Sequence, residues 1–333
     1  MVFNLSMDLN TQIDGAGLYP DYPGDLSTFV PINTMISDVD GNTGSNFSTY
    51  RLNMQFRQDD ESYGWGVYTE ADVHSAYSGK LVLPWGVFGL GIDPDEESAI
   101  RPYVFGGSSL QMVVLPSCCE WIGYGAFLGC TSLESINLGN VARIGRSAFS
   151  GCTSLSQLTL TNTELWSYAF SGCTSLYSLY MTGNGDIGNY AFSSCTSLDN
   201  ITLRGNGDIG NYAFQGCNSM VLATMPNVPS IGEYAFYGCT SLAALDISNV
   251  ESIGAAAFQN CTALYQANGV LHIPESCTFI GSLAFLRCNS ISSVVFDDPE
   301  GWNEDVSDPA INRLQLCAEG VSGRWGDLYK SAA

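Results

Sequence analysis

Apolar residues recur along most of this chain in a pattern that predicts short, one-sided strands. Residues 155–160, Leu-Ser-Gln-Leu-Thr-Leu, place apolar side chains on alternate positions toward their end, as a strand with one buried face does. The same arrangement returns at residues 176–181, 198–203 and 242–247. An Ala-Phe-x-x-Cys segment precedes each run and is too short for a long helix, so it predicts a single helical or 3₁₀ turn. The pattern therefore predicts a repeated unit of one turn and one strand.

This unit returns about every 22 residues. Its phenylalanine falls at positions 127, 149, 170, 192, 214, 236, 258 and 285, a cysteine follows three residues later, and an apolar residue follows at six. A degenerate first copy around Phe105 brings the count to nine. One unit cannot bury these side chains alone, whereas stacked units bury them in continuous columns. We therefore expect an α+β solenoid of about nine units, in which Phe stacks on Phe and Leu on Leu.

The unit Ile-Gly-x-x-Ala-Phe-x-Gly-Cys-x-Ser-Leu resembles the BspA-type leucine-rich repeat, a family named for bacterial surface proteins. The linkers at residues 115–123 and 273–281 are similar to the longer, proline-containing form of that repeat. The segment at 296–310 is similar to one that often follows such arrays. The resemblance covers residues 100–333 and implies a leucine-rich repeat solenoid that serves in binding and adhesion. It implies no shared catalytic residues.

Composition divides the chain near a charged, proline-containing stretch at residues 92–98. Residues 1–98 carry 15 acidic and 3 basic side chains, and they contain alternating stretches such as 50–56 and 80–83. We interpret 1–98 as an acidic, β-rich anchoring domain, 99–296 as the leucine-rich repeat solenoid, and 297–333 as a C-terminal cap.

The net charge of −22 argues against a nucleic-acid partner, because binding a phosphate backbone needs clustered cations. No apolar run is long enough for a membrane helix, and the N-terminal residues have no signal-peptide pattern, so we expect no membrane insertion. The two histidines, His74 and His272, have no nucleophile motif near them. The sequence therefore predicts a protein that is not an enzyme and has no catalytic residues.

The twelve cysteines do not predict a metal site or a disulfide framework. Eight of them share one position of the repeat, and units about 4.8 Å apart hold their sulfurs well beyond disulfide distance. We interpret them as small buried apolar residues. The other four, Cys118, Cys119, Cys277 and Cys317, are thiols or local pairs, and the sequence leaves both alternatives open. We expect no cofactor and no bound metal.

Two acidic motifs have alternative interpretations. Residues 38–42, Asp-Val-Asp-Gly-Asn, match part of a calcium loop but lack its bidentate glutamate, which favours a simple turn. The copies of Gly-Asn-Gly-Asp at 183–186 and 205–208 bring Asp186 near Asp208. Asn-Gly turns account for both copies, and a cation shared by the two carboxylates is the alternative.

The outward positions of the strands form the face on which repeat proteins usually bind. The ligand-binding residues that we predict there are Tyr177, Tyr180, Asp199, Asn200, Thr202 and Arg204. Tyrosine offers a flat ring with a polar tip, and the neighbouring polar groups suit a protein or a glycan. A second row, Tyr168, Tyr190, Tyr212 and Tyr234, lies two residues before each phenylalanine and is interpreted as a packing column.

These observations predict a non-enzymatic recognition or adhesion protein. We expect it to be a component of a phage virion, namely a fibre, decoration or receptor-binding protein. Its expected location is the virion surface or the extracellular space. The solenoid face would contact a host-surface protein or glycan, and residues 1–98 would attach to the virion or another assembly. We expect a homo-oligomer or a part of a larger assembly. The alternative is a secreted or intracellular scaffold that binds other proteins of a cell.

Overall fold

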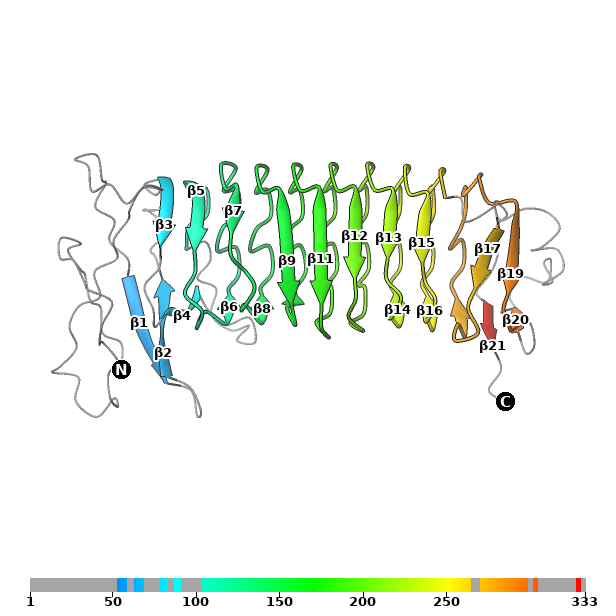
Figure 1. Ribbon diagram of the computed structural model, residues 1–333, viewed down its shortest axis with the longest axis horizontal. Helices are drawn as coiled ribbons and strands as arrows, with labels where there is room; N and C mark the ends of the chain where they lie inside the picture. The colour runs from blue at the N-terminus through cyan, green and yellow to red at the C-terminus, as the bar shows by residue number, and fades with distance from the viewer. Residues whose placement is uncertain are drawn as a thin grey trace.

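The computed structural model describes strand residues 53–58, 63–68, 78–82 and 87–90, then residues 104–264, 270–298, 302–304 and 328–330. Residues 38–42 and Cys317, which the sequence analysis singled out, lie outside the described residues. The described units form an elongated β-solenoid in which successive strands lie side by side (Figure 1).

The first row of strands contains the leucine-rich runs that the alternating pattern predicted. These strands pair in parallel within three sheets, ordered β3-β5-β7, β9-β11-β12-β13-β15 and β17-β19. Their bounds are β3 (Ser78–Val82), β5 (Ser109–Val114), β7 (Ser135–Ile136), β9 (Gln157–Thr161), β11 (Ser178–Thr182), β12 (Asn200–Leu203), β13 (Leu222–Thr224), β15 (Ala244–Asp246), β17 (Val270–Ile273) and β19 (Ser293–Phe296).

A second row of strands was not predicted. It consists mainly of two-residue strands just before the glycine of the repeat, and isolated parallel bridges continue it through Ile187 and Ile209. Its members are β4 (Val87–Leu90), β6 (Trp121–Ile122), β8 (Arg143–Ile144), β10 (Glu164–Leu165), β14 (Ser230–Ile231), β16 (Ser252–Ile253) and β18 (Phe279–Ile280). Two residues are too few to show an alternating pattern, so this row could not be predicted from hydrophobic periodicity.

Antiparallel strands lie at both ends of the second row. At the N-terminal end, β1 (Asn53–Gln58) pairs with β2 (Tyr63–Tyr68), and β2 pairs with β4. At the C-terminal end, β18 pairs with β21 (Leu328–Lys330), which pairs with β20 (Trp302–Glu304). Parallel pairing of β3 with β5 and of β4 with β6 continues across the boundary predicted near residue 98. That boundary and the roles of the three segments stay predictions.

The segment between the rows is a hydrogen-bonded turn rather than a helix, and no helix occurs in the described part of the chain. Alternate N–H groups have different partners. The Ala169 N–H donates within its own unit to the carbonyl of Trp166 (3.2 Å), whereas the Phe170 N–H donates to Ala191 of the next unit (2.7 Å). A helix needs consecutive local bonds, so this alternation prevents one. The fold is a β-solenoid, and the α part of the predicted α+β class is not confirmed.

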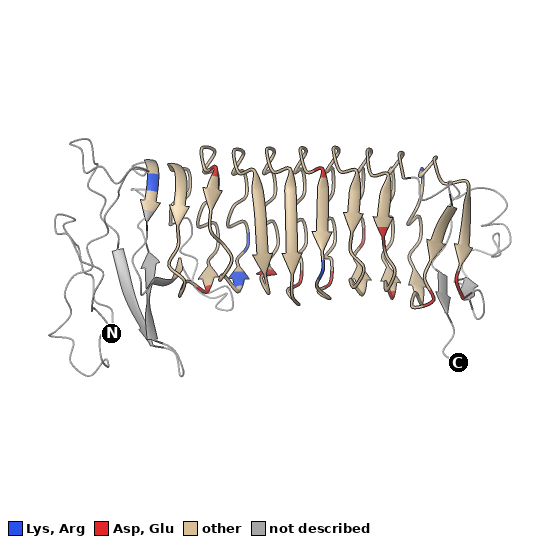
Figure 2. Cartoon of the chain, viewed as in Figure 1, with Lys and Arg blue, Asp and Glu red and all other residues tan. Residues whose placement is uncertain are grey.

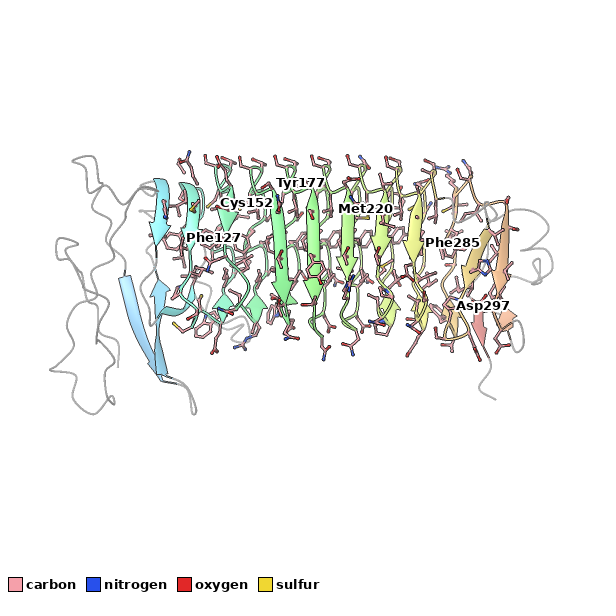
Figure 3. The ribbon with its side chains drawn as sticks, in the orientation of Figure 1. Phe127, Cys152, Tyr177, Met220, Phe285 and Asp297 are labelled. Carbon is pink, nitrogen blue, oxygen red and sulfur yellow. The ribbon has the colours of Figure 1, made fainter. Side chains whose placement is uncertain are left out.

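The phenylalanine column is confirmed, including the degenerate first copy. Nine rings from Phe105 to Phe285 stack one on the next, with centroids 4.9–5.4 Å apart. All nine side chains are at most 1% exposed. Figure 3 labels two members of the column: Phe127, the second ring, and Phe285, the last ring.

The eight repeat cysteines are also buried, and they do more than fill space. Each Sγ donates a hydrogen bond to the carbonyl of the phenylalanine in the preceding unit, at 3.0–3.2 Å. The thiol thus links neighbouring units through a weak donor that a purely apolar residue lacks. Burial raises the pKa of the Cys288 thiol to about 12 and raises the pKa of the Cys152 and Cys173 thiols well above the usual value.

Each turn contains a residue with positive φ directly before the cysteine. Glycine takes this place in most units, for example Gly172 at φ 73° and Gly216 at φ 73°, but Ser194 stands there at φ 62°. A side chain in this left-handed region costs about 1–2 kcal/mol, and glycine avoids that cost.

We therefore expect Ser194→Gly to stabilise the array by about 0.5 kcal/mol. The relief of backbone strain exceeds the added entropy of the unfolded chain by roughly this amount. Urea denaturation of the full chain measures it. Ser197→Gly, an exposed serine three residues later, is the matched control and should destabilise. Equal effects of the two substitutions would contradict the strain argument.

Candidate functional site

The sheet ordered β9-β11-β12-β13-β15 presents one continuous outward face. Its parallel register aligns equivalent residues of successive units: Gln157, Ser178, Asn200 and Leu222 form one row, and Thr159, Tyr180, Thr202 and Thr224 form the next. Burial alternates along the strands, as in Gln157–Thr161, where Leu158 and Leu160 are buried and the other three residues are exposed. The face is therefore built by the same alternation that builds the core.

The structure brings the six predicted binding residues together on the adjacent strands β11 and β12 and at the ends of these strands. Tyr180 of β11 is aligned with Thr202 of β12, and Asn200 precedes Thr202 on the same outward side. Tyr177 and Asp199 lie one residue before their strands and are joined by a hydrogen bond from the Asp199 N–H to the Tyr177 carbonyl (3.1 Å). Arg204 follows β12, and its N–H donates to Met181 (2.9 Å). Whether these residues bind a ligand stays a prediction.

Two residues of this patch were missed by the sequence analysis. Val221 and Leu222, at the start of β13, are 44% and 39% exposed, and Tyr177 and Tyr180 are 45% and 38% exposed. These are four of the six large apolar side chains that are exposed in the described part of the chain. An exposed apolar cluster of this kind marks interaction sites. The available signal was the Val-Leu pair itself, which occupies positions where the three preceding units have Ser-Gln, Tyr-Ser and Asp-Asn.

Charge on this face is sparse and separated. An acidic residue stands at the start of β12 and a basic residue at its end, while β9, β11 and β13 carry none (Figure 2). The Asp199 carboxylate accepts a hydrogen bond from the Asn200 side-chain amide (2.9 Å) and stays exposed. The Gln157 side-chain amide donates to the Tyr177 hydroxyl, which holds that ring at the edge of the patch. Figure 3 shows Tyr177 at the start of its strand, facing outward.

The other tyrosine row is a packing column, as the sequence predicted. Tyr168, Tyr190, Tyr212 and Tyr234 stack with centroids 4.6–4.8 Å apart and rings within 3° of parallel. The guanidinium of Arg146 covers the first ring at 5.8 Å. Because neighbouring rings occupy the inner ring faces, little flat surface is left for a ligand to stack on. This row therefore stabilises the turns and is a poor candidate site.

The repeated Gly-Asn-Gly-Asp motifs are accounted for by internal bonds. The Asp186 carboxylate accepts a hydrogen bond from the Asp208 N–H (2.8 Å), so the two residues do lie close together. Burial and the Asp186 charge raise the pKa of the Asp208 carboxyl.

Among the described residues no group of three or more His, Cys, Asp or Glu side chains is arranged to hold a metal ion. No membrane-spanning helix is found in that same part of the chain.

Comparison with protein-family models finds one matching family. The family model for BspA type leucine rich repeat regions matches residues 98–219 and 185–301 with six copies. A solved leucine rich cell surface protein from Faecalibacterium prausnitzii is similar at 18% identity, with 74% of this chain and 94% of that chain covered and a TM-score of 0.38. The leucine rich repeat protein of T. pallidum is similar at 24% identity, with 63% and 87% covered and a TM-score of 0.38. A search of curated proteins found no match.

The family match spans residues 98–301, which is more than half of the chain, and it coincides with the described phenylalanine column. The chain belongs to the BspA-type leucine-rich repeat family.

Proposed function

We propose that this chain is a non-enzymatic recognition protein that binds a partner surface through the outward face of β9, β11, β12 and β13. The cluster of Tyr177, Tyr180, Val221 and Leu222 on one face supports this function most directly. Keeping such side chains in water is unfavourable, and covering them with a partner removes that apolar surface from water. The rigid, in-register sheet holds the cluster in place before binding, which lowers the entropy lost on association.

The polar neighbours of the cluster add specificity to this proposal. Asn200 and Thr202 offer both donors and acceptors, and Arg204 offers only donors. The two described carboxylates of this face are too far apart to act as an acid and base pair. Asp246 on β15 is two strands away from Asp199 and three residues further along the strand direction, a separation of roughly 14 Å. A binding role therefore suits the face better than catalysis.

The setting of this recognition is a further part of the proposal. A virion surface or cell surface suits an adhesive array, and the fibre, decoration or receptor-binding role in a phage stays a prediction from the sequence. So does attachment of residues 1–98 to a larger assembly. Mass spectrometry of purified virions from the source, with this chain present among the structural proteins, would support the virion setting.

The binding role is tested with the labelled full chain on two immobilised probe arrays, one of glycans and one of random-sequence decapeptides. We expect binding to at least one array and at least fivefold weaker binding for Tyr180→Ala, because a central aromatic contact contributes about 1 kcal/mol or more. Tyr124→Ala is the matched control, since Tyr124 is 41% exposed but lies outside this face. Equal losses in the two variants, or no binding by the unchanged chain, would contradict the proposal.

A further inference from the structure

The outward residues of β12, with the residue directly before it and the residue directly after it, form a polar line between two apolar flanks. We define the β12 seam as Asp199, Asn200, Thr202 and Arg204. Tyr177 and Tyr180 flank it on the β11 side, and Val221 and Leu222 flank it on the β13 side. The Val221 N–H donates to the Asp199 carbonyl (2.7 Å), so the flank begins level with the seam. The β12 seam is polar along its whole length, and exposed apolar side chains lie on both sides of it.

We propose that this seam binds an extended peptide segment of a partner protein. This inference rests on the proposed function and names the class of partner for that same face. The segment lies along β12, its backbone groups bond to the seam, and its apolar side chains cover the two flanks.

The spacing of the seam matches an extended peptide. Asn200, Thr202 and Arg204 are separated by two residues each, so their side chains recur about every 6.6 Å along the strand. In an extended peptide the carbonyl groups that point to one side also recur every two residues, at the same interval. The asparagine amide, the threonine hydroxyl and the arginine guanidinium all donate hydrogen bonds. One extended segment therefore places a carbonyl at each of the three side chains.

The width between the flanks also suits a single extended chain. Neighbouring strands are about 4.8 Å apart, so β11 and β13 are separated by roughly 10 Å across the seam. An extended backbone is about as wide as one strand, and its side chains alternate to the two sides. The segment therefore reaches the tyrosine rings with one set of side chains and Val221 and Leu222 with the other.

The charges at the two ends give the segment a chemical signature. Asp199 and Arg204 are five residues apart, and both are exposed. Within the described residues no carboxylate pairs with the Arg204 guanidinium. The Arg204 backbone is bonded on both sides: its N–H donates to the Met181 carbonyl (2.9 Å), and its carbonyl accepts from the Asn227 side-chain amide (3.3 Å). A matching segment has a basic residue near Asp199, an acidic residue near Arg204, and apolar residues between them.

The aliphatic flank favours a peptide over a glycan. Tyrosine rings suit both kinds of ligand, because sugars and apolar side chains stack on them alike. Val221 and Leu222 carry no polar atoms in their side chains, so they gain from an apolar partner and offer no hydrogen bond to a hydroxyl. A peptide with apolar side chains covers both flanks and the seam together.

The test uses the full chain on an array of capped random-sequence decapeptides, with a glycan array in parallel. We expect the bound decapeptides to be enriched in sequences with one basic and one acidic residue four or five positions apart. Arg204→Glu should weaken these peptides at least tenfold and shift the preference to peptides with two basic residues, because both ends of the seam are then acidic. Leu222→Thr should weaken them at least fivefold.

Val295→Thr is the matched control, because Val295 is 42% exposed on the outer side of β19, away from the seam. Its binding should equal that of the unchanged chain, and the unfolding midpoint of every variant should stay unchanged. Selection without charge preference, or a preference that Arg204→Glu does not alter, would overturn the inference. Binding to glycans but not to peptides would overturn it as well while leaving the proposed recognition function standing. Binding to neither array contradicts the recognition function itself.

Discussion

The free energy of unfolding should fall steeply as the pH rises above about 9. Burial raises the folded-state pKa of seven thiols: those of Cys119, Cys130, Cys152, Cys173, Cys217, Cys261 and Cys288. In the unfolded chain these thiols ionise near pH 8.5, so above that pH the unfolded state binds fewer protons than the folded state. The protonated thiols therefore make their full contribution to the free energy of unfolding below pH 8.5. This contribution is lost progressively as the pH rises toward the folded-state pKa values of the thiols.

The size of this effect follows from the number of thiols. Each contributes a slope of about 1.4 kcal/mol per pH unit, so seven together reach roughly 10 kcal/mol per pH unit. A domain has about 5–15 kcal/mol of stability in total. We therefore expect the array to unfold cooperatively within one or two pH units above pH 9, when followed by circular dichroism and urea titration.

Two variants separate the thiol effect from ordinary destabilisation. The double variant Cys173→Ala and Cys217→Ala should reduce the slope by about 3 kcal/mol per pH unit, because two ionising groups are removed. Leu198→Ala, at an equally buried position, should lower stability at every pH and leave the slope unchanged. A free energy of unfolding that stays constant between pH 8 and 10 would contradict the argument that thiol ionisation destabilises the folded state.

The burial of the repeat thiols also predicts that iodoacetamide at pH 8 leaves all eight of them unmodified in the folded protein.

The core of this protein was predictable because one residue type recurs at one phase of the repeat. The phenylalanine positions alone fix the stacking order, and the nine stacked rings follow it from Phe105 to Phe285. The hydrogen bond from each cysteine to the preceding phenylalanine was not predictable, because it depends on the distance between units. Nor was the second row of strands, since Arg143–Ile144 or Ser252–Ile253 is too short for alternation to appear.

The candidate face was predictable where strand alternation decides which way a side chain points. Asn200 and Thr202 were placed on the outward side for that reason, and the register aligns them with Ser178 and Tyr180. Val221 and Leu222 were missed because the alternating pattern was followed through residues 155–160, 176–181, 198–203 and 242–247 and not through 220–225, where apolar residues stand at adjacent positions. The parallel register places Leu222 beside Asn200, on the outward side. Position in the unit, not hydrophobicity, separates these exposed side chains from the buried Met220 and Ala223.

The second large effect is expected for Phe192→Ala, which should cost about 3–5 kcal/mol of unfolding free energy. Phe192 is fully buried, and its ring stacks on Phe170 at 5.4 Å and on Phe214 at 5.3 Å. The neighbouring units cannot close the gap, because backbone bonds such as Phe192 N–H to Ala213 carbonyl (2.7 Å) fix their separation. The cavity therefore remains, and its cost adds to the lost apolar contact.

Phe192→Leu is the matched control, since it keeps much of the volume and should cost less than about 1.5 kcal/mol. Urea denaturation followed by circular dichroism gives both the free energy and the m-value. Because each unit contacts mainly its neighbours, a gap in the middle also weakens the coupling between the two halves of the array. A lower m-value for Phe192→Ala, with an unchanged m-value for Phe192→Leu, is the expected sign of that uncoupling. Equal costs for the two substitutions would mean that neighbouring side chains fill the gap, and that the stacked rings are not what joins the units.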